Sequence, residues 1–264
     1  MIPAAMITEW SQQCPWISSA QVEQDLILSR ALVEIYRVPA LRESLVFRGG
    51  TALHKLVLQP AARYSEDLDF VQIREEPIGP TFDLLRDALE PWLGEPKTDI
   101  SPRGATQIYR FESETPPIIR LRLKIEINTR EHFHLHPLDQ HEFTVASRWF
   151  NGIAHVPIYS VTELLGTKLR ALYQRRKGRD LFDLWHAHQA GAVNPAKVVA
   201  VFRHYMDAEQ HSVTQAVFRS NLEAKMNSKA FLTDTPPLLR SGVEFDPQTA
   251  FQFVNNSLLT LLKL

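Results

Sequence analysis

The chain has 264 residues, of which 44% are hydrophobic, 22% charged and 9% aromatic. This is the composition of an ordinary globular protein, and it excludes intrinsic disorder, collagen-like repeats and disulfide scaffolds. The chain carries 29 lysines and arginines against 30 aspartates and glutamates, so no overall basic excess attracts it to nucleic acid or to anionic membranes. Any nucleic-acid site must therefore be a local patch.

The sequence indicates a cytoplasmic protein. Cys14 is the single cysteine, which excludes an intramolecular disulfide and a zinc site built from several thiolates. The first ten residues include Glu9 and lack the basic and apolar regions of a signal peptide. No segment approaches the roughly 18 apolar residues that a membrane-spanning helix needs, so we expect no membrane partner.

The first predicted elements are a helix and a strand–turn–helix unit. Apolar residues recur every three to four positions over residues 18–36, which predicts an amphipathic helix. The apolar run at 45–47 ends at Gly49 and Gly50, and the pattern at 51–58 is again helical.

Residues 65–71 alternate between polar and apolar side chains, which predicts a strand with Leu68 and Phe70 facing the core. A helix is expected over 81–93 and a strand over 107–111. From 120 to 128 the alternation is cleaner than anywhere else in this half and predicts a second half-buried strand.

The second half of the chain is predicted to be helical. Ser160 and Glu163 have capping-box spacing and open a helix that continues towards Arg176, with Gly178 as its stop. Further helices are expected over 180–191, 197–206, 213–226 and 249–262. We place a boundary near residue 158, between a mixed α/β half and a helical half.

Three carboxylates form a candidate metal site. Asp67 and Asp69 stand two apart on a predicted strand, so both project from one face, and Mg²⁺ prefers such oxygen ligands. Glu126, on the polar face of the later strand, is a candidate third ligand. The alternatives are a solvated acidic rim and simple pairing of Glu126 with Arg122 or Lys124.

The glycine turn is a candidate phosphate site. Gly49, Gly50 and Thr51 lie between a strand and a helix, where the backbone can approach a phosphate closely. Ser65 would orient a carboxylate or bind phosphate. Plain turns at both places are the alternative, and the spacing of a Walker A loop is absent.

Residues 168–179 carry six positive charges and no acid until Asp180. They could hold a triphosphate or an RNA backbone, or could simply complement a helix C-terminus. Asp180 has an alternative reading as a helix N-cap, and we expect Asp183 to pair with a neighbouring arginine. The cations are Lys168, Arg170, Arg175, Arg176, Lys177 and Arg179.

Taken in order, these features resemble the polymerase β-type nucleotidyltransferase core. Four segments, at 47–55, 63–70, 168–172 and 179–184, resemble the motifs of the AbiEii family of nucleotidyltransferase toxins from abortive-infection and toxin–antitoxin systems. Their sequences are Phe-Arg-Gly-Gly-Thr-Ala-Leu-His-Lys, Arg-Tyr-Ser-Glu-Asp-Leu-Asp-Phe, Lys-Leu-Arg-Ala-Leu and Arg-Asp-Leu-Phe-Asp-Leu.

The resemblance implies an α+β fold: a nucleotidyltransferase domain over residues 1–158, with a mixed sheet and flanking helices, and an all-helical domain over 159–264 that completes the active-site cleft. It assigns the nucleotide to Gly49, Gly50, Thr51, Ser65 and Lys168, and catalysis to Asp67, Asp69, Lys168 and Asp180. Metal would be held by Asp67, Asp69 and Glu126, and RNA or phosphate by Arg170, Arg175, Arg176 and Arg179.

The function implied is Mg²⁺-dependent transfer of a nucleoside monophosphate from a nucleoside triphosphate (NTP) co-substrate to an acceptor hydroxyl, with release of pyrophosphate. The acceptor would be RNA, such as the 3′ end of tRNA, and a separately encoded antitoxin would restrain the toxin. Two alternatives stay open. The same chemistry could act on a protein or small molecule, or the pocket could be a non-catalytic regulatory module.

Overall fold

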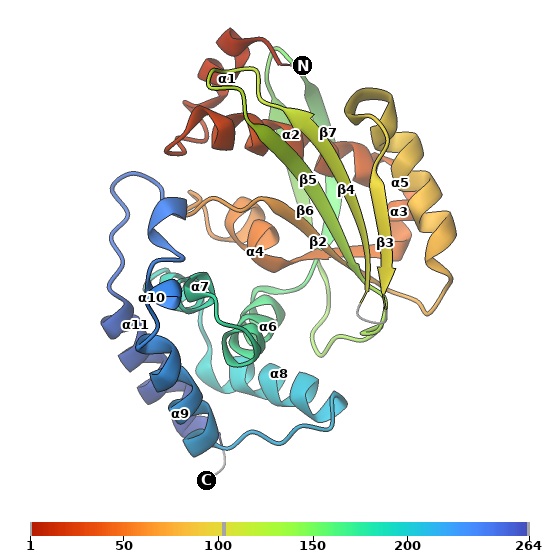
Figure 1. The fold of residues 1–264 in the computed structure, drawn as a ribbon. Helices are drawn as coiled ribbons and strands as arrows, with labels where there is room; N and C mark the ends of the chain where they lie inside the picture. Colours follow the sequence, from red (N-terminus) through yellow and green to blue (C-terminus); the bar gives the residue numbers. More distant parts are fainter. Residues whose placement is uncertain (1, 102–103, 263–264) are drawn as a thin grey trace. The chain divides into compact units, whose positions relative to one another are not determined.

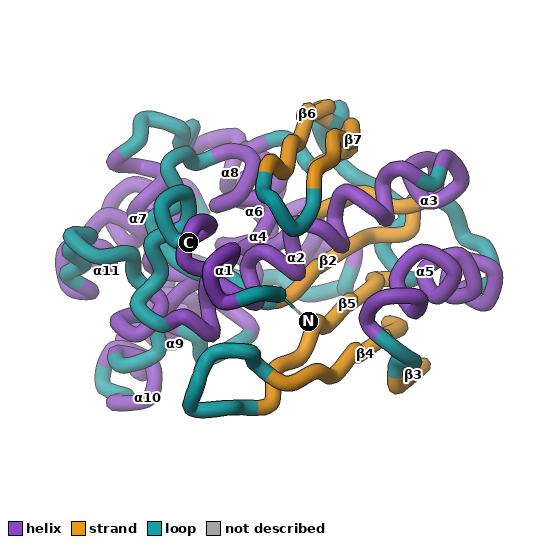
Figure 2. Tube along the Cα trace, turned by 90° about the horizontal axis from the view of Figure 1, so that it is seen from above, coloured by secondary structure: helices purple, strands orange, loops and turns teal. Residues whose placement is uncertain are grey.

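The computed structural model describes residues 2–101 and 104–262, and its central feature is a seven-stranded sheet with the order β3-β4-β5-β2-β1-β7-β6. Figure 2 shows β2, β5, β4 and β3 in succession, with β7 and β6 beyond β2. Neighbouring strands are antiparallel except for the parallel pairs β2–β5 and β1–β7. The strands are β1 (Leu45–Arg48), β2 (Asp67–Gln72), β3 (Lys97–Ser101), β4 (Gly104–Glu112), β5 (Arg120–Asn128), β6 (Asp139–Ala146) and β7 (Asn151–Ile158). This mixed sheet with flanking helices confirms the predicted α+β class.

The two long helices among the first five pack on one face of the sheet. In β4, Gln107 donates a hydrogen bond to the Phe82 carbonyl of α5, and Tyr36 of α2 lies against Phe70 of β2 at 5.9 Å between ring centroids. The apolar side chains of β5 are buried on this face, while its polar side chains occupy the other. The helices are α1 (Ala4–Trp10), α2 (Ser19–Arg37), α3 (Pro39–Ser44), α4 (Gly49–Ala52) and α5 (Ile78–Leu93).

The chain divides into two compact units (Figure 1). The sheet unit runs to His134 and resumes from Leu138 to Tyr159, and the helical unit comprises Leu135–Pro137 and the chain from Ser160 onward. The helical unit contains α6 (Val161–Gln174), α7 (Gly178–Gln189), α8 (Pro195–Ala208), α9 (Gln215–Met226), α10 (Lys229–Leu232) and α11 (Pro247–Phe253). The sequence placed this division after residue 158.

Two helix ends differ from the prediction. Helix α6 ends at Gln174, and Gly178 begins α7 instead of stopping α6. A Cβ at Gly178 would lie 2.2 Å from the Phe231 carbonyl oxygen, so close packing explains this glycine. The predicted helix 249–262 is broken into α11, a π-helical turn over Val254–Leu258 and a 3-10 turn over Leu259–Leu261. No helix in the described part of the chain is long and apolar enough to span a membrane.

Helix α2 buries an acidic residue, which predicts a pH-dependent stability. Glu23 is fully buried, and its carboxylate accepts a hydrogen bond from the backbone N–H of Glu114 at 3.1 Å. Burial raises the pKa of Glu23 to about 7. The folded state therefore binds more protons than the unfolded chain between the unfolded pKa and pH 7, and stability falls as pH rises through that window.

We expect Glu23→Gln to remove this pH dependence. Since one pKa unit corresponds to about 1.4 kcal/mol, the variant should gain up to about 3 kcal/mol at pH 8 and almost nothing at pH 4.5. Urea unfolding at the two pH values measures the difference. Glu43→Gln, at an exposed position of α3, is the matched control. A variant that is equally destabilised at both pH values would mean that the hydrogen bond outweighs burial.

Candidate functional site

The turn between β1 and α4 accepts only glycine at its first position. Gly49 has φ +82°, and a Cβ on it would lie 2.1 Å from Oδ2 of Asp69. A Cβ on Gly50 would lie 2.5 Å from Nη2 of Arg63 and 3.1 Å from Oγ of Ser65. The two glycines therefore keep the backbone open directly against polar side chains of the segment at 63–70.

Adding one methyl group at this turn should be severe. Gly49→Ala combines a left-handed backbone with displacement of the Asp69 carboxylate, and we expect a loss of roughly 2–3 kcal/mol in the free energy of unfolding. Activity should fall with it, because Asp69 can no longer hold its position. Gly79→Ala is the control, since a Cβ there has nothing within 4 Å. If Gly49→Ala and Gly79→Ala unfolded at the same temperature, the turn at Gly49 would not require glycine.

Thr51 and Ser65 fasten the turn to the start of β2. Oγ1 of Thr51 lies 2.6 Å from the Asp67 carbonyl oxygen, and a hydrogen bond of 2.9 Å joins it to Oγ of Ser65. Thr51 is 1% exposed. Its single proton is donated to the Asp67 carbonyl, so the Ser65 hydroxyl is the donor to Thr51, and the backbone N–H groups of the turn are the remaining candidate phosphate donors. The nucleotide contacts of Thr51 and Ser65 stay predictions.

Asp67 has a carboxylate oxygen that is buried without a hydrogen-bond partner among the described residues. Burial raises the pKa of Asp67 to about 7, and the negative charges of Asp69 and Glu66 add to the effect. A buried oxygen with no donor and a repelling carboxylate neighbour is costly unless a cation neutralises it. This donor set fits a divalent metal ion, and Asp67 with Asp69 would hold it.

Glu126 lies directly across from Asp69 in the β2–β5 pair. Its carboxylate forms an ion pair of 2.5 Å with Lys124, which was the alternative left open by the sequence. No group of three or more histidine, cysteine, aspartate or glutamate side chains arranged to hold a metal ion occurs within residues 2–101 and 104–262. The role of Glu126 as a third ligand stays a prediction.

Arg63 is a site residue to which the sequence pattern assigned no role. It is 2% exposed, donates a hydrogen bond of 2.9 Å to the Tyr64 carbonyl, and places its guanidinium against Gly50. A buried arginine beside a glycine turn supplies positive charge where a phosphate would approach. In the sequence, only its position two residues before Ser65, inside the motif at 63–70, indicated that Arg63 could belong to the site.

The helical unit holds a second charged cluster, centred on Lys168 of α6. Its ammonium nitrogen lies 3.2 Å from Asp180 and 2.8 Å from Asp183, which are one turn apart on α7. Arg175 closes the cluster with two hydrogen bonds to Asp180, of 2.7 and 2.8 Å. The aspartates are fully buried, whereas the Arg175 side chain is half exposed.

The geometry corrects one expectation for α7 and identifies a partner at another position. Asp180 is not the N-cap, because Lys177 occupies that position. Asp183 forms an ion pair of 2.8 Å with Lys168. Burial alone would raise the pKa of Asp180, but the Lys168 charge and the Arg175 hydrogen bond outweigh it and lower the pKa. Asp180 therefore stays ionised and fixes both cations.

Most of the basic run is neutralised by acids from elsewhere in the helical unit. Arg170 lies 3.3 Å from Glu209 and stacks over Tyr205. Arg179 pairs with Asp234 at 3.9 Å, as does Lys177 at 3.6 Å. The side chain of Arg176 is exposed and makes no ion pair with another described residue. Most of the positive charges at 168–179 are therefore paired with acidic side chains of the helical unit.

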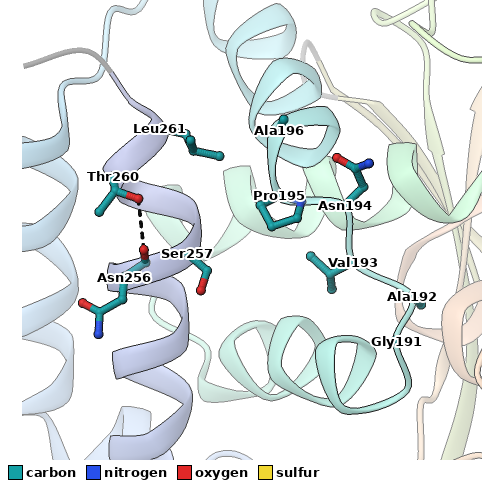
Figure 3. A pocket seen from close by; sticks show the side chains of 10 residues that line it. All are labelled: Gly191, Ala192, Val193, Asn194, Pro195, Ala196, Asn256, Ser257, Thr260 and Leu261. Carbon is teal, nitrogen blue, oxygen red and sulfur yellow. Dashed lines mark hydrogen bonds between the residues drawn. The ribbon is translucent and has the colours of Figure 1, made fainter.

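The helical unit also contains a pocket of about 790 Å³ (Figure 3). It is lined by residues 191–196 and by Asn256, Ser257, Thr260 and Leu261, which include no charged side chain and none of the predicted site residues. Within it, the Thr260 hydroxyl donates to the Asn256 carbonyl at 3.0 Å. The chemistry of this pocket does not match that of a nucleotide or metal site.

Comparison with known proteins identifies the family. A family model described as "Nucleotidyl transferase AbiEii toxin, Type IV TA system" matches residues 30–253. The fold is similar to that of MenT4, a nucleotidyltransferase toxin from Mycobacterium tuberculosis H37Rv, with a TM-score of 0.52 and 18% identity over 100% of both chains. An antigenic nucleotidyltransferase-like protein from Paracoccidioides brasiliensis matches 77% of this chain and 95% of its own, with 16% identity and a TM-score of 0.43. No curated protein sequence matches the chain.

Proposed function

The chain belongs to the AbiEii family of nucleotidyltransferase toxins of type IV toxin–antitoxin systems, and we propose that it transfers a nucleoside monophosphate from an NTP to the 3′ hydroxyl of an RNA such as tRNA. The family implies an antitoxin partner. We further propose that the modified RNA arrests growth, in abortive infection or a related response, and that a separately encoded antitoxin restrains this activity.

The unpartnered oxygen of Asp67 carries the proposal. Asp67 is a buried carboxylate beside Asp69 with an oxygen that has no hydrogen-bond partner in the described chain, and a divalent cation bound to the pair would neutralise both charges. Bound Mg²⁺ would supply Lewis-acid activation and neutralise charge on the phosphates. A module that only bound a nucleotide would not need two carboxylates on β2 beside the glycine turn.

The remaining residues bind and orient the substrates. The acceptor hydroxyl loses its proton to water and its oxygen forms a bond to the α-phosphorus, while the bond from that phosphorus to the oxygen bridging to the β-phosphate breaks and pyrophosphate leaves. In this scheme the backbone at Gly49 and Gly50 holds the triphosphate, and the Ser65 hydroxyl contacts it by turning its proton from Thr51 to the phosphate. An ammonium has three N–H donors, so the two aspartates leave one on Lys168 for a phosphate. Asp180 positions Lys168.

The test is label transfer from each of four α-³²P-NTPs, in the presence of Mg²⁺, into bulk bacterial RNA, a protein lysate and a small-molecule extract. We expect a discrete labelled RNA band and a preference for particular NTPs. Label in protein or metabolite, with none in RNA, would replace RNA as the acceptor while keeping the chemistry. Nucleotide binding by calorimetry without label in any fraction would overturn the enzymatic proposal.

A further inference from the structure

A pair of arginines stands on the polar face of the sheet. Arg110 of β4 and Arg122 of β5 are directly opposite in the antiparallel pair, so their side chains project from the same face. Arg120 is the next residue of β5 on that face. All three are exposed. We refer to Arg110, Arg120 and Arg122 as the strand patch.

The strand patch lacks the internal neutralisation found in the helical unit. No ion pair or hydrogen bond holds the guanidinium of Arg110 or Arg122 against another described residue, and the acid opposite in register, Glu112, faces Arg120. Like charges directly opposite each other destabilise a strand pair. Sheet stability therefore gives no reason for two arginines at these positions, whereas an anionic ligand does.

The strand patch shares its face with the aspartate pair. Asp67 is opposite Lys124, and Asp69 is opposite Glu126 in the parallel β2–β5 pair. Because residues two apart on a strand are about 7 Å apart, Arg122 lies about 7 Å beyond the row of Asp67 and Arg120 about 13 Å beyond it. A chain of phosphates whose end reaches the aspartates would pass over these arginines.

We propose that the strand patch binds the phosphate backbone of the acceptor RNA, with Arg110 and Arg122 as the principal contacts. This assignment rests on the proposed function, because it places the reactive end of the RNA at Asp67 and Asp69. Arginine binds phosphate through paired N–H donors, which an exposed, unpaired guanidinium offers without first breaking an internal ion pair. Continuity with the aspartate pair favours RNA over an acidic protein.

The test is binding of a 5′-fluorescein-labelled, single-stranded RNA dodecamer, measured by fluorescence anisotropy between 50 and 200 mM KCl without NTP or divalent metal. For Arg110→Gln/Arg122→Gln we expect affinity to fall about tenfold at 100 mM salt. Because this variant neutralises two fewer phosphates, the slope of log affinity against log salt should decrease by about 1.4. Arg42→Gln/Lys229→Gln removes two exposed charges elsewhere and should change affinity by less than about twofold.

Three further measurements separate the possible failures. Asp67→Asn, which should not transfer nucleotides, should bind the dodecamer at least as well as the native protein. RNA binding therefore tests the strand patch whether or not the protein transfers nucleotides to RNA. Arg110→Gln/Arg122→Gln should unfold at or above the native temperature, because a repulsion is removed. Native-like RNA binding by this variant would overturn the assignment. Polyglutamate, in place of the RNA, represents an acidic protein in the same measurement. If Arg110→Gln/Arg122→Gln lost binding to polyglutamate but kept binding to RNA, the strand patch would be assigned to an acidic protein instead.

Discussion

Asp67→Asn should abolish nucleotidyl transfer while leaving the protein folded. Metal-dependent stabilisation of the transition state is worth several kcal/mol, so kcat should fall by about 10³-fold or more. The thermal unfolding temperature in EDTA should not fall, because the substitution removes a buried charge that has no partner in the described chain. Steady-state kinetics and calorimetry measure the two effects separately.

The control for this variant is Asp87→Asn, at an exposed position of α5, which should keep native activity and stability. A titration with Mg²⁺ adds a second readout. Mg²⁺ should raise the unfolding temperature of the native protein and of Asp87→Asn but not that of Asp67→Asn. An Asp67→Asn variant that retains transfer would show that the reaction uses other ligands.

Lys168→Met should cost both stability and activity. Removal of one partner from a buried ion pair costs about 3–5 kcal/mol, and here it removes the Lys168 charge from both Asp180 and Asp183. We expect the free energy of unfolding to fall by about this amount in urea titrations at pH 7. Transfer should fall as well, because the proposed phosphate donor is gone.

A second substitution separates the two roles of Lys168. In Lys168→Met/Asp183→Asn the charge of Asp180 is still matched by Arg175, so at least half of the lost stability should return. Transfer should stay low, since no ammonium is restored. Full recovery of activity together with stability would show that Lys168 only supports the helices.

The parts of the fold that were predictable are those whose side-chain pattern is local and strong. The strand at 120–128 was predicted with its observed bounds, because four large apolar residues alternate with charged ones. The helix at 18–36 begins at its Ser18 cap and differs from α2 by one residue at its end. The order of strand, glycine turn and aspartate strand was likewise visible.

Several strands were missed because their burial is slight or depends on small residues. Strand β3 is exposed throughout, and β6 is an edge strand with Val145 as its buried residue. In β7 the first two inward positions are Gly152 and Ala154, which give little apolar contrast with their neighbours. The short helices α1 and α3 also lack enough turns for a clear period.

The charged sites show a different limit of sequence reasoning. The basic run at 168–179 looked like an anion site, yet its partners Glu209 and Asp234 come from 30 or more residues later in the chain. A pattern of one residue type within a segment cannot reveal a counter-charge brought in by folding. By contrast, the Arg110 and Arg122 charges become significant only through the strand register that places them opposite each other.

The most direct test of the central claim compares intact tRNA with tRNA whose 3′ diol has been destroyed by periodate. With a labelled NTP and Mg²⁺, we predict that label appears in intact tRNA and that one pyrophosphate is released per nucleotide transferred. Periodate-treated tRNA should take up no label and release no pyrophosphate above background. Equal labelling of both RNAs, or label in RNA without pyrophosphate, would contradict transfer to the 3′ hydroxyl.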